Sequence, residues 1–277
     1  MTTQNKKAVL ITGCSSGIGL NATQYLSERG FHVIASVRKT DDISILKSRG
    51  IECIQLDLAD SDSIESAVDY INQYHPSLYG LVNNGAYGQA GAVEDLSRSA
   101  LREQFETNLF GTHELTQKLM PIFHQHGVGR IVQISSVLGV IALPFRGAYN
   151  ASKFALEGLS DTQRLELHDT NIKISLVEPG AIETRFRANA KLYFEKHIDT
   201  QNSRFKAQYQ KVTERLERQE NARFTESAER VSKDIHHALT AAKPKIRYRI
   251  TIPTIIGSKL KRLLPDRMMD KISKNNG

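Results

Sequence analysis

The sequence predicts an α/β domain built on a doubly wound parallel sheet with helices on both faces. One observation is a series of short apolar runs rich in β-branched residues, at positions 8–12, 32–37, 52–56, 78–82, 130–135 and 173–177. A second is that the longer stretches between these runs keep apolar residues at helical spacing. Strands that alternate with helices form a parallel sheet covered on both faces, with right-handed crossovers. A third is that no Pro-, Ser- or Gly-rich linker interrupts residues 8–180, which predicts one domain.

The pattern changes after the last of these runs. Residues 185–225 are polar, charged and helical in pattern, and we expect them to form a lid over a substrate site. We expect a further helix over 228–239 and a short strand over 245–251. These elements place the main domain at residues 1–250 and a C-terminal extension at residues 251–277.

Composition excludes several classes of protein. The chain has 277 residues, of which 40% are apolar and 24% charged, as in ordinary globular domains and unlike disordered chains. Two cysteines, Cys14 and Cys53, cannot form a disulfide framework. No apolar run approaches the roughly 20 residues of a membrane span, and no cleavable signal pattern is present. We therefore expect a soluble, cytoplasmic protein.

The positive charge of the chain is concentrated at its end. Residues 243–277 contain ten basic and two acidic residues, whereas residues 1–242 are close to neutral. The extension mixes these cations with isoleucines and leucines and has no recognition motif or interleaved aromatics, so we expect no nucleic-acid partner. Three roles stay open for it: contact with an anionic membrane surface, packing as a lid or between subunits, and a solvated end.

A glycine-rich turn follows the first apolar run, with the sequence TGCSSGIG from Thr12 to Gly19. Gly13, Gly17 and Gly19 permit a tight turn and a close approach of the backbone to a pyrophosphate. The N-terminus of the following helix offers free N–H groups to the same phosphates. The turn therefore predicts a Rossmann-type domain that binds a dinucleotide, although a plain strand–helix turn has the same pattern.

The end of the second apolar run indicates which dinucleotide is bound. An acidic residue there would accept a hydrogen bond from the ribose 2′-hydroxyl of NAD, and an arginine would accommodate the 2′-phosphate of NADP. Arg38 and Lys39 occupy this position. We therefore expect NADP(H) to be favoured over NAD(H).

Ser136, Tyr149 and Lys153 form the second candidate motif. Tyr149 and Lys153 lie four residues apart on a predicted helix, so their side chains share a face. An ammonium beside a phenol favours the phenolate and lowers the pKa of the phenol. Ser136 follows the fifth run, at the edge of the sheet where ligands bind, and its hydroxyl could hold a substrate oxygen while Tyr149 moves a proton. Taken alone, the pair could equally be a helix tyrosine with a solvated lysine.

Together these motifs resemble the short-chain dehydrogenase/reductase family. The resemblance covers roughly residues 6–186 and includes, in family order, TGCSSGIG, Asp57, NNGA at 83–86, Asn108, ISS at 134–136, YNASK at 149–153 and EPG at 178–180. The segment 147–167 resembles the steroid and retinol dehydrogenase branch, and the ending resembles the YbbO-type oxidoreductases of bacteria. One departure is NNGA where the family usually has NNAG, which would strain Ala86 if that position required a positive φ.

The resemblance implies a role for each matching residue. It implies that Tyr149 transfers the proton, that Lys153 lowers its pKa and holds the nicotinamide ribose, that Ser136 binds the carbonyl oxygen, and that Asn108 supports a water. It also implies a cofactor-binding set formed by Gly13, Ser15, Ser16, Gly17, Ile18, Gly19, Arg38, Asp57, Leu58, Asn84, Tyr149, Lys153, Ile182 and Thr184. No metal site is expected.

The implied activity is hydride transfer between NADPH and an aldehyde or ketone, and the partner is a small carbonyl or alcohol. We expect Ser136, Leu138, Leu143, Phe145, Tyr149 and Phe186 to contact the substrate, with Tyr193 and Phe194 in the lid. These side chains favour an apolar substrate such as a retinoid, a steroid or a long-chain aldehyde. A sensor or scaffold that binds NADP(H) without catalysis is the alternative. The resemblance also allows a homo-oligomer paired through the helix around 158–167.

Overall fold

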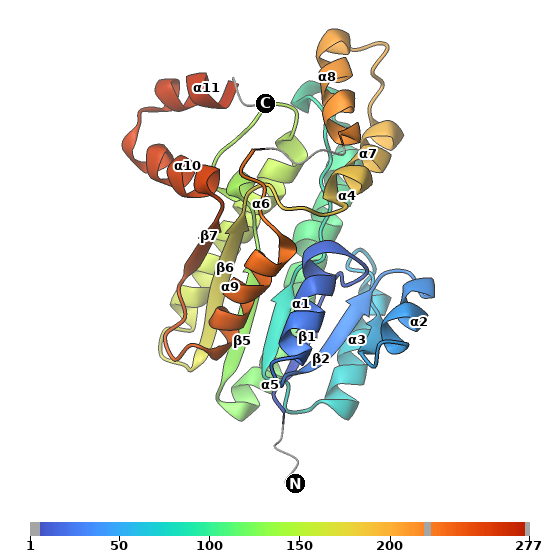
Figure 1. The fold of residues 1–277 in the computed structure, drawn as a ribbon, viewed down its shortest axis with the longest axis vertical. Coiled ribbons are helices and arrows are strands. Elements are labelled where there is room, and N and C mark those ends of the chain that lie inside the picture. Colours follow the sequence, from blue (N-terminus) through green and yellow to red (C-terminus); the bar gives the residue numbers. More distant parts are fainter. Residues whose placement is uncertain (1–5, 219–222, 275–277) are drawn as a thin grey trace.

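A computed structural model of the chain describes residues 6–218 and 223–274. Its centre is a seven-stranded sheet in the order β3-β2-β1-β4-β5-β6-β7, and every pairing is parallel (Figure 1). The strands are β1 (Ala8–Ile11), β2 (His32–Val37), β3 (Glu52–Gln55), β4 (Gly80–Asn83), β5 (Gly129–Ile134), β6 (Ile172–Pro179) and β7 (Arg247–Ile250). The order reverses direction beside β1, which makes the sheet doubly wound and places a ligand crevice at its carboxyl edge.

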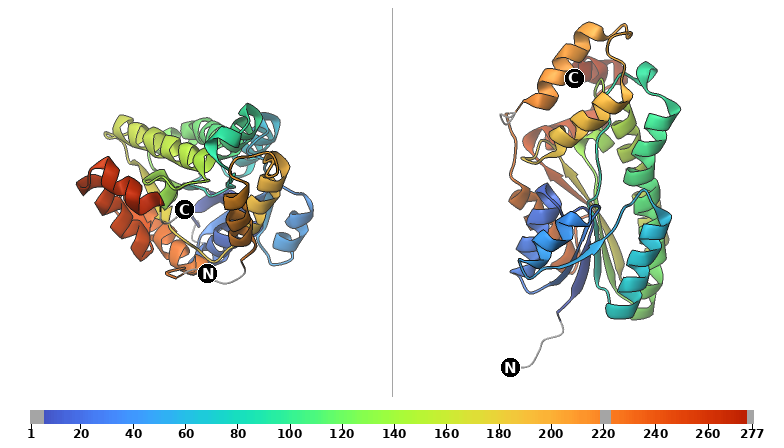
Figure 2. Two further views of the ribbon diagram at one scale, coloured as in Figure 1. Left: turned by 90° about the horizontal axis from the view of Figure 1, so that it is seen from above. Right: turned by 90° about the vertical axis from the view of Figure 1, so that its right-hand side faces the viewer.

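Alternate side chains of each strand serve two separate cores. Val9 and Ile11 of β1 pack on one face with α1 (Gly17–Ser27), α2 (Asp41–Lys47) and α9 (Ala228–Thr240). Ala8 and Leu10 pack on the other face with α3 (Ser61–Tyr74) and α5 (Gly111–His126). The same face also carries α6 (Gly147–Glu166), which runs beside β6, and α4 (Arg98–Phe105). Figure 2 shows the two helical layers around the sheet. The predicted fold class is confirmed.

The predicted strands match the observed ones to within one or two residues. β4 begins at Gly80 although the apolar run begins at Leu78, and differences of the same size occur at the end of β6 and the start of β7. The N–H of Leu78 donates to the carbonyl of His75, so Leu78 belongs to the turn that ends α3. An apolar run marks burial, and the hydrogen-bonded ladder need not extend over all of it.

The expected lid consists of two helices, α7 (Phe186–His197) and α8 (Lys206–Glu217). Their apolar residues form a third core with the segment that follows β4, made of Ala90, Ala92, Phe194, Ile198 and Tyr209 with Leu96, Phe145 and Phe205 packed against it. The Tyr209 hydroxyl donates to Asp95 and accepts from the N–H of Ala92. The lid is therefore a packed layer above the carboxyl edge of the sheet (Figure 1). Part of its predicted range, residues 219–222, lies outside the described residues.

The chain closes with α10 (Ile252–Leu263) and α11 (Asp266–Lys274), beyond the edge strand β7 (Figures 1 and 2). The inner side of α10 packs on β7 and on the turn Val137–Gly139, with Thr254 and Ser258 fully buried. Among the described residues, no helix is long and apolar enough to cross a membrane. The last three residues of the predicted extension and the first five of the predicted domain lie outside the described range.

Candidate active site

The glycine-rich turn between β1 and α1 forms a cradle that side chains would fill. Gly13 and Gly17 have φ angles of 71° and 59°, a conformation that favours glycine. A Cβ on Gly13 would lie 2.8 Å from the Cα of Gly85, and one on Gly19 would overlap the carbonyl oxygen of Gly13. The N-cap residue Ser16 makes no side-chain cap and the first turn of α1 has no acidic residue, so the helix N-terminus keeps its affinity for an anion. The residues fit the pyrophosphate of a dinucleotide.

Asn84 holds the backbone of this turn in place through hydrogen bonds. Its Nδ2 donates to the carbonyl oxygens of Thr12 and Gly13, at 2.9 and 3.1 Å. The Thr12 hydroxyl accepts from the backbone N–H groups of Asn84 and Gly85. Neither Gly85 nor Ala86 has a positive φ, so the strain expected from the NNGA order does not arise. Gly85 is required by packing instead, because a Cβ there would lie 2.9 Å from Leu58 Cδ1.

Three residues predicted for the adenosine end lie past the ends of β2 and β3. Arg38 directly follows β2, and Asp57 and Leu58 follow β3. Asp57 caps its own turn by accepting from the N–H of Ala59, while Leu58 is buried. The guanidinium of Arg38 donates to the hydroxyl of Tyr193 on the lid helix α7, at 3.1 Å. The lid is thus joined to the residue predicted to hold the 2′-phosphate.

The segment after β6 brings Ile182 and Thr184 to the same edge. Ile182 forms an isolated bridge with Glu226, which fixes the segment before α7 begins. The side chain of Thr184 faces the glycine-rich turn, because a Cβ on Gly17 would lie 3.0 Å from Thr184 Cγ2. Thr184, predicted for the nicotinamide end of the site, therefore lies against the glycine-rich turn predicted for the pyrophosphate.

Ser136, Tyr149 and Lys153 converge as the sequence predicts. Ser136 follows β5, and Tyr149 and Lys153 lie one turn apart on α6, all three buried. The Lys153 Nζ lies 5.8 Å from the centroid of the Tyr149 ring and donates to the carbonyl oxygen of Ile134, at 2.7 Å. The Ser136 Oγ accepts from the N–H of Leu138, at 3.1 Å. This bond fixes the Ser136 oxygen beside the phenol.

The pKa of Tyr149 differs from the expectation that Lys153 lowers it. Burial raises the pKa of Tyr149 to about 12, and the hydrogen bond with Ser136 opposes that rise only in part. Burial also lowers the pKa of Lys153 to about 8, although the nearby Glu157 carboxylate opposes this change. Loss of water is the largest cause of both shifts, and Lys153 is not among the groups that shift the pKa of Tyr149. The phenol is therefore protonated at neutral pH, as a proton donor must be.

Asn108 lies in a short π-helical turn between α4 and α5, spanning Glu106–Phe110. Such turns often mark functional sites because they displace one side chain from the helical array. Asn108 Nδ2 donates to the carbonyl of Tyr87 and to the hydroxyl of Ser152, and its Oδ1 accepts from the N–H of Tyr87. Asn108 thus joins the strand end after β4 to helix α6.

The predicted substrate residues divide into two groups. Leu138 is buried beside Ser136, and Phe186 packs edge-on against the Tyr149 ring with centroids 5.4 Å apart. Leu143 is half-buried in the same loop. Phe145, however, has a φ of 61° and packs against Phe205 and Tyr209 inside the lid core. Phe194 is buried in that core as well.

Two tyrosines at the site were not assigned a cofactor role from sequence. Tyr87 and Tyr193 stack with ring centroids 3.7 Å apart, and the Tyr87 hydroxyl is buried with no hydrogen-bond partner in the described structure. Burial raises the pKa of Tyr87, so this hydroxyl stays protonated. Tyr87 directly follows NNGA, a position that predicts a place in the wall of the substrate pocket. Nothing in the sequence indicated that Tyr193 would reach Arg38.

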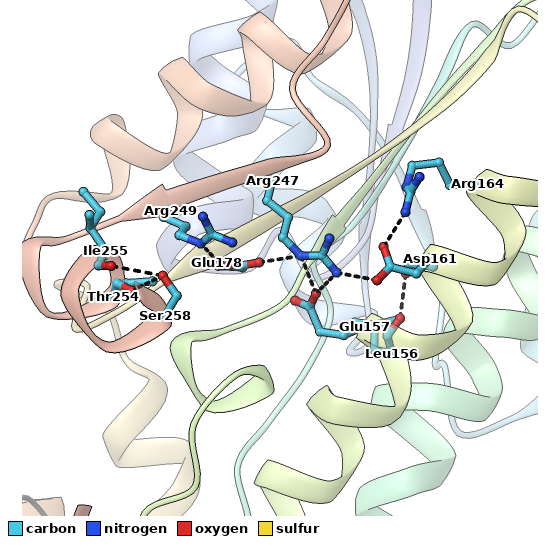
Figure 3. Close-up of polar contacts among 11 residues, drawn as sticks. Leu156, Glu157, Asp161, Arg164, Glu178, Arg247, Arg249, Thr254, Ile255 and Ser258 are labelled. Carbon is cyan, nitrogen blue, oxygen red and sulfur yellow. Dashed lines mark hydrogen bonds and ion pairs between the residues drawn. The ribbon is translucent and has the colours of Figure 1, made fainter. Parts of the chain in front are cut away.

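A partly buried ion-pair network joins α6, β6 and β7 (Figure 3). Arg247 of β7 bonds Glu157 and Asp161 of α6 and contacts Glu178 at the end of β6, with N···O distances of 2.7–3.1 Å. Arg249 holds the other oxygen of Glu178, at 3.0 Å. Glu178 is fully buried, and Glu157 follows Lys153 by one turn. The network therefore fixes α6, which carries Tyr149 and Lys153, to the end of the sheet.

A separate polar cluster lies at the opposite edge of the sheet. His32 and His75 each place Nε2 within 2.7 Å of one oxygen of Glu52, and Tyr70 donates to the same carboxylate at 2.8 Å. The ligand atoms of His32, Glu52 and His75 lie within 4.8 Å of one another, which is close enough for a metal ion. The sequence gave no signal of this cluster because its members come from three distant elements.

Comparisons with known proteins agree with this geometry. The model of the short chain dehydrogenase family matches residues 7–192. The chain belongs to the short-chain dehydrogenase/reductase family. Relatives in this family include the uncharacterized oxidoreductase YbbO of Escherichia coli, which is 44% identical over 96% of this chain and 94% of its own length. The family consists of oxidoreductases that bind a nicotinamide cofactor, which confirms the predicted class of protein.

Two further members show the range of the family. The NADPH-dependent 3-dehydrocapnine reductase of Ornithobacterium rhinotracheale is 31% identical over 95% of this chain and 94% of its own length. The crystal structure of a family member from Burkholderia phymatum in complex with NAD has a TM-score of 0.78, with 22% identity over 99% of this chain and 97% of its own. The first of these proteins is named for its dependence on NADPH, and the second was solved with NAD bound.

Proposed function

We propose that the protein reduces an aldehyde or ketone with NADPH as the hydride donor. The observation that carries this proposal is the convergence of Ser136, Tyr149 and Lys153 at the edge of the sheet that also carries a glycine cradle with no room for side chains. NADPH, when bound, supplies the hydride. The protein supplies orientation, a proton and exclusion of water.

Each member of the proposed catalytic set has one task. Tyr149 donates its phenolic proton to the carbonyl oxygen of the substrate. A phenol is protonated at neutral pH, and burial raises the pKa of Tyr149 further. Ser136 donates its hydroxyl proton to the same oxygen and orients it. Lys153, held by the Ile134 carbonyl, places a positive charge below the phenolate that remains. Asn108 holds the backbone of Tyr87 against α6 and keeps the wall of the site in place.

Replacement of Tyr149 tests the enzyme assignment. General acid catalysis contributes about 10²–10⁴-fold, so Tyr149→Phe should lower kcat with an apolar carbonyl by that factor while the Kd for NADPH stays the same. Absorbance at the NADPH band measures the first and fluorescence titration the second. Full activity of Tyr149→Phe would refute the assignment. Tight NADPH binding with no turnover of any carbonyl would favour the alternative, a sensor or scaffold.

For the cofactor, we propose a preference for NADP(H) that depends on Arg38. A guanidinium next to the end of β2 suits a 2′-phosphate, and Tyr193 keeps it facing the lid. Arg38→Ala should raise KM for NADPH more than KM for NADH, and Lys39→Ala is the matched control on the exposed neighbour. Equal effects of Arg38→Ala on the two cofactors would contradict this preference.

For the substrate, we propose an apolar carbonyl such as a retinoid, a steroid or a long-chain aldehyde. Leu138 lies beside Ser136 and Phe186 beside Tyr149, and both offer apolar surface next to the reacting group. Leu143 is half-buried in the loop that carries Leu138. Phe145 packs in the lid core and acts on the substrate only by supporting that lid. A panel of retinal, a steroid ketone, a long-chain aldehyde and a polar sugar tests this, and activity with the sugar alone would contradict it.

The remaining sequence expectations stand as proposals. We place the catalytic unit at residues 1–250 and the extension at 251–277. Among the described residues, no helix could span a membrane. Phe154, Leu159 and Leu165 of α6 are exposed on one side of that helix, which favours a homodimer through it. Light scattering of Leu165→Glu tests this pairing, because a charge at a paired surface would yield monomers. Unchanged mass would contradict it.

A further inference from the structure

Helix α10 turns small polar residues inward and large apolar residues outward. Thr254 and Ser258 are fully buried against β7 and the turn after β5, whereas Ile252, Ile256 and Leu263 are 53%, 51% and 78% exposed. A surface helix of a soluble domain normally shows the opposite arrangement. The apolar face of α10 is therefore free to contact a partner outside the folded domain.

The exposed residues form a continuous stripe. Ile252, Ile256 and Leu263 follow each other at helical spacing, and Lys259 occupies the intermediate position. Ile255, 40% exposed, widens the stripe on the side of Arg262. Helix α11 adds Met268, 50% exposed, between further cations. We call this set the C-terminal surface; its members are Ile252, Ile255, Ile256, Lys259, Arg262, Leu263 and Met268.

The charge around the C-terminal surface selects its partner. Helices α10 and α11 together contain six basic and two acidic residues, and Asp266 is already paired with Lys261. A second copy bound through the same surface would place these two basic surfaces against each other and incur repulsion. A nucleic acid would pair with the cations and leave the isoleucines and leucines exposed to water. An anionic bilayer satisfies both kinds of side chain.

We propose that α10 and α11 bind the surface of an anionic lipid bilayer, with α10 in the plane of the interface. Ile252, Ile256 and Leu263 enter the boundary between headgroups and acyl chains. Lys259 lays its aliphatic stem along the same boundary while its ammonium reaches the headgroup phosphates. Arg262 contacts the phosphates beside it.

Docking in this orientation has a consequence for the substrate. The inner side of α10 meets Ile141, in the loop that also carries Leu138 and Leu143, and a Cβ on Gly257 would lie 3.4 Å from Ile141. The bilayer would lie close to the apolar side of the proposed substrate site. A membrane-dissolved carbonyl therefore fits better than a freely soluble one, and this consequence alone rests on the proposed function.

The test is co-sedimentation of the full-length protein with vesicles. Vesicles of phosphatidylcholine mixed with phosphatidylglycerol should bind the protein, vesicles of phosphatidylcholine alone should bind it far less, and salt should weaken binding. Each cation near an anionic surface contributes about fivefold in partitioning, so Lys259→Gln with Arg262→Gln should lower the partition coefficient about 25-fold. Ile256→Glu with Leu263→Glu should abolish binding. Ile45→Glu, at a residue 52% exposed on α2, is the matched control and should bind normally.

Several results would overturn the proposal. These are no binding to the mixed vesicles, or binding that Ile256→Glu with Leu263→Glu leaves unchanged. A dimer in light scattering that this double variant makes monomeric, without any vesicle binding, would identify a second copy as the partner instead. Circular dichroism checks that each variant is folded. Reduction of a water-soluble aldehyde reports the enzyme separately, so failure of docking and failure of the proposed function give different patterns.

Discussion

Lys153→Met should change the pH dependence of stability as well as the activity. Burial lowers the pKa of Lys153 from 10.5 to about 8 in the folded protein. Between these two values the unfolded chain holds a proton that the folded chain has released, so stability rises with pH. With a slope of about 1.4 kcal/mol per pH unit inside this window, the wild type should gain about 2 kcal/mol between pH 7 and pH 9.5 from this group. Methionine does not titrate, so the variant lacks this gain.

Urea denaturation followed by circular dichroism at pH 7 and pH 9.5 measures the difference. The Met variant also leaves the Ile134 carbonyl without its donor, but that penalty is the same at both pH values. Tyr149→Phe is the control, because it should lose activity and still show the full pH-dependent gain. Parallel stability profiles for the wild type and Lys153→Met would refute the conclusion that burial of this ammonium is costly.

Three further predictions concern the rest of the chain. Gly19→Ala would push a methyl group into the Gly13 carbonyl and should lower the free energy of unfolding by about 1–3 kcal/mol. It should also weaken NADPH binding in a fluorescence titration. Unchanged binding would contradict the proposal that this turn holds the pyrophosphate. Arg247→Met leaves buried carboxylates without their main partner and should cost about 3–5 kcal/mol in urea unfolding, so a loss well below 1 kcal/mol would contradict the network. Burial works to raise the pKa of Glu52, but hydrogen bonds from neighbouring histidines and a tyrosine hold it below its usual value. The stability that Glu52 contributes should therefore disappear as the pH falls below 4.5, and Glu52→Gln should equal the wild type only in acid.

Features that depend on residues close together in the chain could be predicted from the sequence. Tyr149 and Lys153 are four residues apart in a segment predicted to be helical, so their shared face on α6 could be predicted from that spacing. The glycines of the turn after β1 are required by φ angles and by close contacts that no other residue type satisfies. The strands were found because a buried parallel strand is apolar along its whole length.

The sequence was insufficient wherever contacts join distant elements. Arg38 and Tyr193 are 155 residues apart, and only the lid packing brings them together. The direction of the Tyr149 pKa shift also needed the structure, because burial of the phenol, which raises its pKa, cannot be read from the spacing of Tyr149 and Lys153. Phe145 is predicted to contact the substrate because it lies in the same loop as Leu138 and Leu143. Its positive φ instead turns the ring into the lid core, against Tyr209.

The arginines of β7 determine when this protein can complete its folding during translation. Arg247 and Arg249 neutralise carboxylates that β6 and α6 have already brought together, and they leave the ribosome about 70 residues after Glu178, as their sequence numbers require. Until then the nascent chain carries several mutually repelling carboxylates at the position where Tyr149 and Lys153 must be aligned. The proposed active site is therefore completed late in translation, when β7 pairs with the open edge of β6. A chain that stops short of β7 would carry every proposed catalytic residue and still lack the charges that hold α6 in place.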